Sequence, residues 1–101
     1  MILVVFRTRV QPENEARYHA LVVEIDKLVQ TMPGFISEKT FSHEDGERVS
    51  VQEWESAEHV KAWRDHPKHR AAQEAGRTTF YEEYALFVAD APRESRFKRR
   101  D

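Results

Sequence analysis

The sequence has no cysteine and only three glycines. Without cysteine the chain cannot form a disulfide, a thiolate nucleophile or a thiolate metal site. Gly34, Gly46 and Gly76 stand apart from one another, which excludes a glycine-rich phosphate-binding loop. No apolar run approaches the roughly 20 residues that a transmembrane helix needs. The apolar first six residues lack a basic leader and a cleavage site, so they indicate a strand rather than a signal peptide. We therefore expect a cytoplasmic protein with no membrane partner.

The chain also lacks a strong charge bias. Its formal net charge is −2 and its pI is about 6.2, which gives no global indication of nucleic-acid binding. Charge is uneven only at the end, where residues 92–101 carry five basic and two acidic side chains. With 101 residues the chain is long enough for one domain. We expect a domain of residues 1–91 and a basic C-terminal tail of residues 92–101.

Apolar side chains recur with two different periods along the chain. Alternation indicates strands, and three- and four-residue steps indicate helices. The predicted strands are residues 2–10, 35–42, 48–54 and 78–89, and the predicted helices are residues 16–32, 56–65 and 67–76. Right-handed crossovers in this βαββαβ order give a four-stranded antiparallel sheet with its helices on one face. The sequence therefore predicts an α+β fold, a ferredoxin-like plait.

The first and last predicted strands are apolar on both faces. In residues 78–89 one alternating set is Phe80, Tyr84, Leu86 and Val88, and the other is Tyr81, Ala85 and Phe87. Helices can cover only one face of the sheet, and large apolar patches are uncommon on soluble monomers. Burying each such side chain contributes roughly 1.5–3 kcal/mol. We therefore expect a homodimer packed sheet to sheet.

Residues 51–73 carry both tryptophans and three of the five histidines. Ser56 has the side chain of a helix N-cap, and Pro67 ends one helix and suits the first position of the next. The strand that ends in Trp54-Glu55-Ser56, the helix that carries Trp63, and the run His66-Pro67-Lys68-His69-Arg70 resemble the antibiotic biosynthesis monooxygenase domain. This domain belongs to the dimeric α/β-barrel superfamily, and the resemblance covers about residues 1–90.

The resemblance implies a dimer whose two sheets enclose a barrel, with a pocket between sheet and helices in each subunit. Members with known chemistry oxidise aromatic molecules with O₂, without metal or flavin, through a substrate carbanion. Such chemistry needs a dry pocket, a base and a group that holds an anion. The candidate base is His69 or His66, whose pKa is ordinarily near neutrality, and Arg7 is the candidate anion holder. The candidate pocket walls are Trp54, Trp63, Phe80, Tyr81 and Tyr84.

Each of these residues also has a structural interpretation. The tryptophans can be core anchors, and His69 can be a solvated or hydrogen-bonded side chain. Arg7 can form an ion pair with Glu53 or Glu83 on adjacent strands. A metal site made of His66, His69 and Asp65 is a further alternative, although we expect no metal and no cofactor.

Two other functions stay open at this point. A haem-degrading monooxygenase is one, but Gln73 stands where haem-degrading relatives place the iron-ligating histidine, and Phe6-Arg7 stands where they have asparagine. A non-catalytic homodimer that binds a small apolar ligand is the other. The leading hypothesis is a cofactor-independent monooxygenase that acts on a small aromatic or quinol-type molecule.

Overall fold

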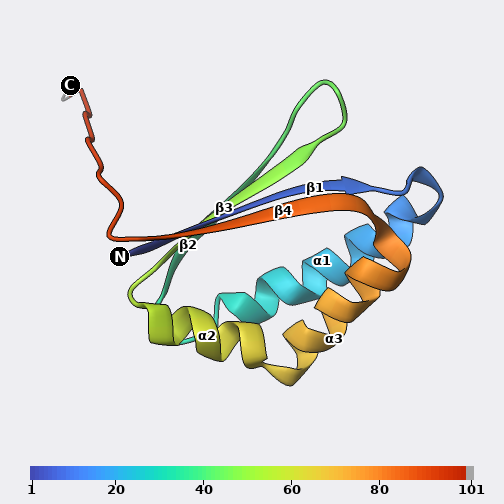
Figure 1. The fold of residues 1–101 in the computed structure, drawn as a ribbon, viewed down its shortest axis with the longest axis horizontal. Coiled ribbons are helices and arrows are strands. Elements are labelled where there is room, and N and C mark those ends of the chain that lie inside the picture. Colours follow the sequence, from blue (N-terminus) through green and yellow to red (C-terminus); the bar gives the residue numbers. More distant parts are fainter. Residues whose placement is uncertain (100–101) are drawn as a thin grey trace.

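The computed structural model describes residues 1–99, and the last two residues of the predicted tail lie outside this range. The strands are β1 (Ile2–Val10), β2 (Phe35–Ser42), β3 (Arg48–Trp54) and β4 (Tyr81–Asp90), and the helices are α1 (Glu15–Val29), α2 (Ala57–Asp65) and α3 (Pro67–Ala75). The sheet is antiparallel with the order β2-β3-β1-β4. All three helices lie on one side of it (Figure 1). The predicted α+β, ferredoxin-like plait is confirmed.

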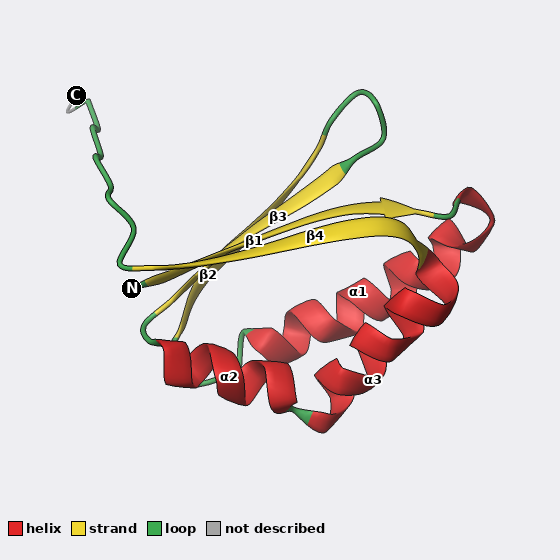
Figure 2. Cartoon of the chain, viewed as in Figure 1, coloured by secondary structure: helices red, strands yellow, loops and turns green. Residues whose placement is uncertain are grey.

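Local sequence signals explain most element boundaries. The Ser56 hydroxyl accepts a hydrogen bond from the His59 backbone N–H at 3.3 Å and so caps α2. The His66 ring caps α3 by accepting from the Lys68 N–H at 3.2 Å, directly before Pro67. In the turn between β2 and β3, Gly46 takes a positive φ of 94°, which glycine adopts without steric strain. The alternating helices and strands are drawn in Figure 2.

The start of the last strand differs from the prediction. We expected a strand from residue 78 and a helix that stops at Gly76, but the chain continues from α3 through a π-helical turn, Gly76–Phe80. Gly76 has a helical φ of −58°, so it does not act as a left-handed cap. A side chain at this position would overlap the ring of Tyr81. The glycine therefore permits a close approach between the helical turn and β4.

The two faces of the sheet have different environments. On the helix side, Ile2 and Val4 are buried with Val29, Trp54 and Trp63 in the hydrophobic core. On the other side, which we call the open face, the strand register places the larger apolar side chains of the three adjacent strands β3, β1 and β4: Leu3, Val5, Val49, Val51 and Phe87. Within residues 1–99 no helix covers the open face (Figure 2).

Residues 91–99 form no helix or strand and run away from the helices, on the side of the open face (Figure 1). Arg96 pairs with Glu53 of β3 at 2.7 Å and with Glu94 at 2.6 Å. The Phe97 side chain is 82% exposed. No helix within the described residues is long and apolar enough to cross a membrane.

Candidate functional site

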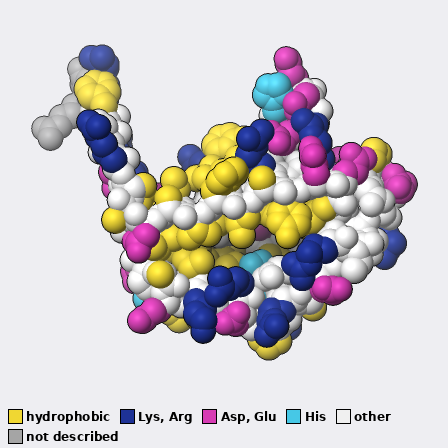
Figure 3. All heavy atoms as spheres, viewed as in Figure 1, with side chains coloured by type: hydrophobic (Ala, Val, Ile, Leu, Met, Phe, Trp, Pro, Cys, Tyr) yellow, Lys and Arg dark blue, Asp and Glu magenta, His cyan; other side chains and the backbone are white. Residues whose placement is uncertain are grey.

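A cavity of about 250 Å³ lies between the sheet and the helices. Its walls are mainly apolar and include Val4 and Phe6 of β1, Leu21 and Ile25 of α1, and Leu86 of β4. The space-filling view shows a hollow below the sheet in which hydrophobic side chains surround a histidine, with basic side chains along its lower rim (Figure 3). The polar side chains that reach this cavity come from a small number of positions, and they decide its chemistry.

Trp63 and His69 form one wall of the cavity. Their rings stack with centroids 4.1 Å apart and an interplanar angle of 14°. Trp63 is buried and also lies against Trp54, at a centroid distance of 6.5 Å. The break between α2 and α3 produces this arrangement, because the chain turns at Pro67 and brings His69 back over the end of α2. The helix that carries Trp63 and the helix that carries His69 thus fix one aromatic stack.

Hydrogen bonds set the proton position on His69. Its Nδ1 lies 3.2 Å from the Trp63 carbonyl oxygen, which can only accept, so in this contact Nδ1 carries the proton and Nε2 is left as the acceptor. Gln73 Nε2 lies 3.3 Å from the same Nδ1 and donates to the Arg64 carbonyl at 3.0 Å. Burial lowers the pKa of His69 below its ordinary value of 6.5, against the opposite effect of the Trp63 carbonyl. The ring is therefore neutral at neutral pH.

Tyrosines and a phenylalanine make up a second wall. Phe6, Tyr81 and Tyr84 form a mutual cluster with centroid distances of 5.5–5.7 Å, and Tyr18 joins it through Tyr81 at 5.6 Å. Tyr81 and Tyr84 both reach the cavity because the pairing of β1 and β4 shifts between Arg9 and Val10. Burial raises the pKa of Tyr81, so its phenol stays neutral and is a poor base.

Four of the predicted site residues, Trp54, Phe80, His66 and Arg7, do not line the cavity. Trp54 is fully buried between Phe35 and Trp63, and Phe80 is buried against Tyr18; both belong to the core rather than to the cavity wall. The His66 ring caps α3 and does not line the cavity. The structure therefore brings together His69, Trp63, Tyr81 and Tyr84.

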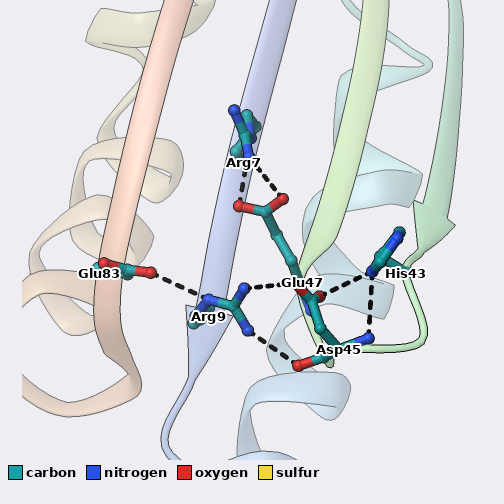
Figure 4. Close-up of polar contacts among 6 residues, drawn as sticks. All are labelled: Arg7, Arg9, His43, Asp45, Glu47 and Glu83. Atoms are coloured by element: carbon teal, nitrogen blue, oxygen red, sulfur yellow. Dashed lines mark hydrogen bonds and ion pairs between the residues drawn. The ribbon is translucent and has the colours of Figure 1, made fainter.

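Arg7 is separated from the cavity by the sheet itself. It belongs to the open-face set of β1, and its guanidinium donates to both carboxylate oxygens of Glu47, at 2.8 and 3.2 Å. Figure 4 shows this pair within a network in which Arg9 binds Asp45 and Glu83. Arg7 therefore does not hold an anion in this cavity, and its partner is neither Glu53 nor Glu83.

Two carboxyl groups at the cavity were not predicted from the sequence. Glu38 of β2 and Asp26 of α1 both line it and lie against each other. Burial, followed by the contact with Asp26, raises the pKa of Glu38 from 4.5 to about 7, against the opposite effect of a hydrogen bond from Gln52. A second, more open hollow of about 510 Å³ also borders both carboxyl groups.

Two arginines and Gln73 add to the polar lining, together with Ser50 and Gln52 of β3. Arg64 of α2, Gln73 of α3 and Arg77 of the π-helical turn all border the cavity. Arg77 pairs with Glu74 at 3.2 Å and also interacts with Tyr84. Among residues 1–99 no group of three or more His, Cys, Asp or Glu side chains is arranged to hold a metal ion, so His66, His69 and Asp65 do not form a site.

Comparisons with known proteins match both the sequence and the fold. The family model for antibiotic biosynthesis monooxygenase matches residues 1–75. The chain is 34% identical over 89 residues to the uncharacterized protein YqjZ of Bacillus subtilis, and this matched region covers 88% of this chain and 78% of that protein. The solved structure of Rv0793 from Mycobacterium tuberculosis has a TM-score of 0.82 at 18% identity and covers 94% of this chain and 98% of that one. SnoaB from Streptomyces nogalater, described as a cofactor-independent oxygenase, has a TM-score of 0.77 at 15% identity, and the match covers 92% of this chain and 94% of that one.

Proposed function

Because the chain belongs to the antibiotic biosynthesis monooxygenase family, we propose that it oxidises a small aromatic or quinol-type molecule with O₂ in the cavity between sheet and helices, without a cofactor. The observation that carries this proposal is the stack of a neutral histidine on Trp63 inside a cavity with aromatic walls. The described chemistry of SnoaB, which has the same fold, gives further support.

The side chains supply what the first step requires. His69 Nε2 takes the proton of a ring hydroxyl, the O–H bond breaks, and its electron pair stays on the substrate as a phenolate with carbanion character. Electrons pass from this anion to O₂, and a ring carbon bonds to one oxygen atom. The resulting peroxide takes the proton back from the imidazolium to become a hydroperoxide. Loss of water then breaks the O–O bond and the C–H bond of the same ring carbon and leaves a quinone, so one oxygen atom enters the product and the other leaves in water with that hydrogen and the returned proton.

The surroundings of His69 favour this proton transfer. Arg64 and Arg77 border the cavity and stabilise an anionic oxygen there, which is the role we expected of Arg7. The apolar walls exclude water and strengthen these charge interactions. Because only neutral imidazole accepts a proton, the rate should rise with pH through the lowered pKa of His69.

The test is O₂ uptake by metal-free and flavin-free protein in a screen of quinols and hydroxylated naphthalenes. His69→Phe keeps an aromatic ring on Trp63 but removes the base, so turnover should fall about 10²–10⁴-fold. His19→Phe, at an exposed position on α1, is the matched control and should retain turnover. Full turnover in His69→Phe would refute the assignment of the base. If no compound is oxidised but some are bound and released unchanged, the protein is a ligand-binding module.

The dimer is a separate part of the proposal. Phe41 and Phe87 lie on the open face with 56% and 54% of their surface exposed, and a second copy packed on this face would bury them. In that arrangement the two sheets face each other as a dimeric α/β barrel. Each cavity stays on the helix side of its own sheet.

A further inference from the structure

The Asp26–Glu38 pair lies at the end of the cavity that the reaction described above leaves unused. The neighbouring strand β3 holds Glu38 in place, because Gln52 Nε2 donates a hydrogen bond to Glu38 Oε2 at 2.5 Å. Trp54 Nε1 in turn donates to Gln52 Oε1 at 3.0 Å, so a core tryptophan fixes the amide. Like charges in contact repel and burial disfavours charge, so Glu38 keeps its proton to a higher pH than an ordinary carboxyl group does. Around neutral pH the pair is therefore partly protonated and still carries negative charge.

The polar groups of the cavity are divided between the two edges of the sheet. Glu38 is on the edge strand β2, and Asp26 reaches it from α1. Arg77 and Tyr84 are at the opposite edge strand β4 and the turn that leads into it, and His69 is on α3, which precedes that turn. The edge strands are three strand spacings apart, about 14–15 Å at 4.7–4.9 Å per spacing. Apolar side chains of β1 and α1 line the space between them.

We propose that the Asp26–Glu38 pair is a second polar subsite of the cavity, which receives an uncharged hydroxyl or carbonyl oxygen of a ligand whose acidic hydroxyl is held near His69. This proposal rests on the proposed function, and it specifies the substrate class: a flat aromatic molecule with oxygen substituents at both ends. The pair offers both a proton and free lone pairs, so it can donate to a carbonyl or accept from a hydroxyl. Its negative charge disfavours a carboxylate at this end.

The opposite charges of the two ends give the ligand one orientation. The charged and titratable groups around the cavity are Asp26 and Glu38 at one end, and Arg64, His69 and Arg77 with the tyrosines Tyr18, Tyr81 and Tyr84 elsewhere. An acidic hydroxyl is stabilised next to the arginines and disfavoured next to the carboxyl pair. The subsite therefore both selects the ligand and turns its acidic hydroxyl toward the base.

The test measures the affinity of three naphthalene probes by calorimetry without O₂, so that binding is independent of turnover. The probes are 2,6-dihydroxynaphthalene, naphthalene-2,6-dicarboxylic acid, which places a carboxylate at the subsite in either orientation, and, as the control that lacks a group for the subsite, 2-naphthol. The wild type should bind the diol about tenfold more tightly than the dicarboxylate at about pH 7, and this preference should grow at about pH 8 as the second carboxyl of the Asp26–Glu38 pair ionises. Glu38→Gln keeps one charge, so it should keep the preference but lose its growth with pH. The double variant Asp26→Asn/Glu38→Gln is neutral and should bind both within about threefold.

Each outcome has one meaning. Equal affinity of the wild type for diol and dicarboxylate, a full preference in the double variant, or no binding of any probe overturns the subsite. 2-Naphthol should bind the wild type and both variants equally. If only the double variant fails to bind 2-naphthol, the cavity of the double variant has changed shape. The pH dependence of the preference in Glu38→Gln then decides whether the subsite exists. If the predicted binding preferences are found but no compound is oxidised, the proposed oxygenase is refuted and the subsite is supported. If O₂ uptake is found without the binding preferences, the subsite is refuted and the oxygenase is supported.

Discussion

Replacing Glu38 by glutamine should change stability in a way that depends on pH. Burial and the contact with Asp26 raise the pKa of Glu38 from 4.5 to about 7 in the folded protein. As the pH rises between these two values, the unfolded chain loses the Glu38 proton while the folded protein keeps it, so the free energy of unfolding falls. At pH values below 4.5 the Glu38 carboxyl does not lower the free energy of unfolding, and at pH values above about 7 its destabilising effect is complete. Glutamine cannot ionise and carries no such penalty.

The magnitude follows from the size of the pKa change. A rise from 4.5 to about 7 corresponds to roughly 3 kcal/mol, at about 1.36 kcal/mol per unit. Glu38 keeps contact with water through the more open hollow, and screening reduces this to about 1–2 kcal/mol. Glu38→Gln should therefore be more stable than the wild type by about 1–2 kcal/mol at about pH 8, and most of this difference should be lost by about pH 5.

His69 acts in the opposite direction over part of this range. Its pKa is lowered in the folded state, so the folded protein takes up fewer protons and loses stability as the pH falls from 6.5 through the lowered value. In the wild type the gain from Glu38 offsets this loss. Glu38→Gln removes the gain, so its stability should decline in acid more steeply than that of the wild type.

Urea unfolding followed by tryptophan fluorescence between about pH 5 and 8 measures both effects, since unfolding exposes Trp54 and Trp63. Glu24→Gln makes the same change of charge at an exposed position of α1 and serves as the control. A stability difference between Glu38→Gln and the wild type that stays constant with pH would refute the reasoning, because it would mean that Glu38 has an ordinary pKa.

Three other predictions concern the core, the open face and the tail. Trp63→Ala should cost about 3–5 kcal/mol in urea unfolding because it removes the ring between Trp54 and His69, and a loss below about 1 kcal/mol would contradict this packing. The wild type should have about twice the 11.9 kDa chain mass in light scattering, and Phe87→Glu should dissociate it while the control Phe97→Glu should not; a monomeric wild type would exclude the dimer. Deleting residues 93–101 should leave the melting temperature nearly unchanged, because the Arg96–Glu53 pair is exposed; a large loss would show that the tail docks on the body.

The parts of the fold that depend on local patterns were accessible from the sequence. Alternation placed the first three strands, and the Ser56 cap and Pro67 placed the short helices, because these signals act within a few residues. The start of β4 was predicted wrongly. Alternating apolar residues from residue 78 onward favoured a strand, but packing of Phe80 on Tyr18 holds this segment in a helical turn.

The polar part of the candidate site depends on contacts between distant elements. Asp26 and Glu38 are twelve residues apart and each resembles an ordinary solvated carboxylate, and only the crossover from α1 to β2 brings them together. For Arg7 the alternation of β1 already indicated a face shared with Leu3 and Val5. In the structure the helices cover the face of β1 that carries Ile2 and Val4. Because β1 is apolar on both faces, the sequence alone does not show which face this is.

The topology assigns the two ends of the cavity to separate stretches of chain. Residues 26–38, from the end of α1 into β2, carry the carboxyl pair, whereas residues 63–77 carry the tryptophan–histidine stack and both arginines. A crossover to each edge strand is a general feature of the plait, so any chain with this fold builds its cavity from two such independent segments. Under the proposed mechanism, substitutions at positions 26 and 38 should therefore alter which oxygen substituent is accepted without moving His69. Substitutions at positions 64 and 77 should alter how an anion is held without affecting the acid pair, so that ligand preference and proton transfer can be changed separately.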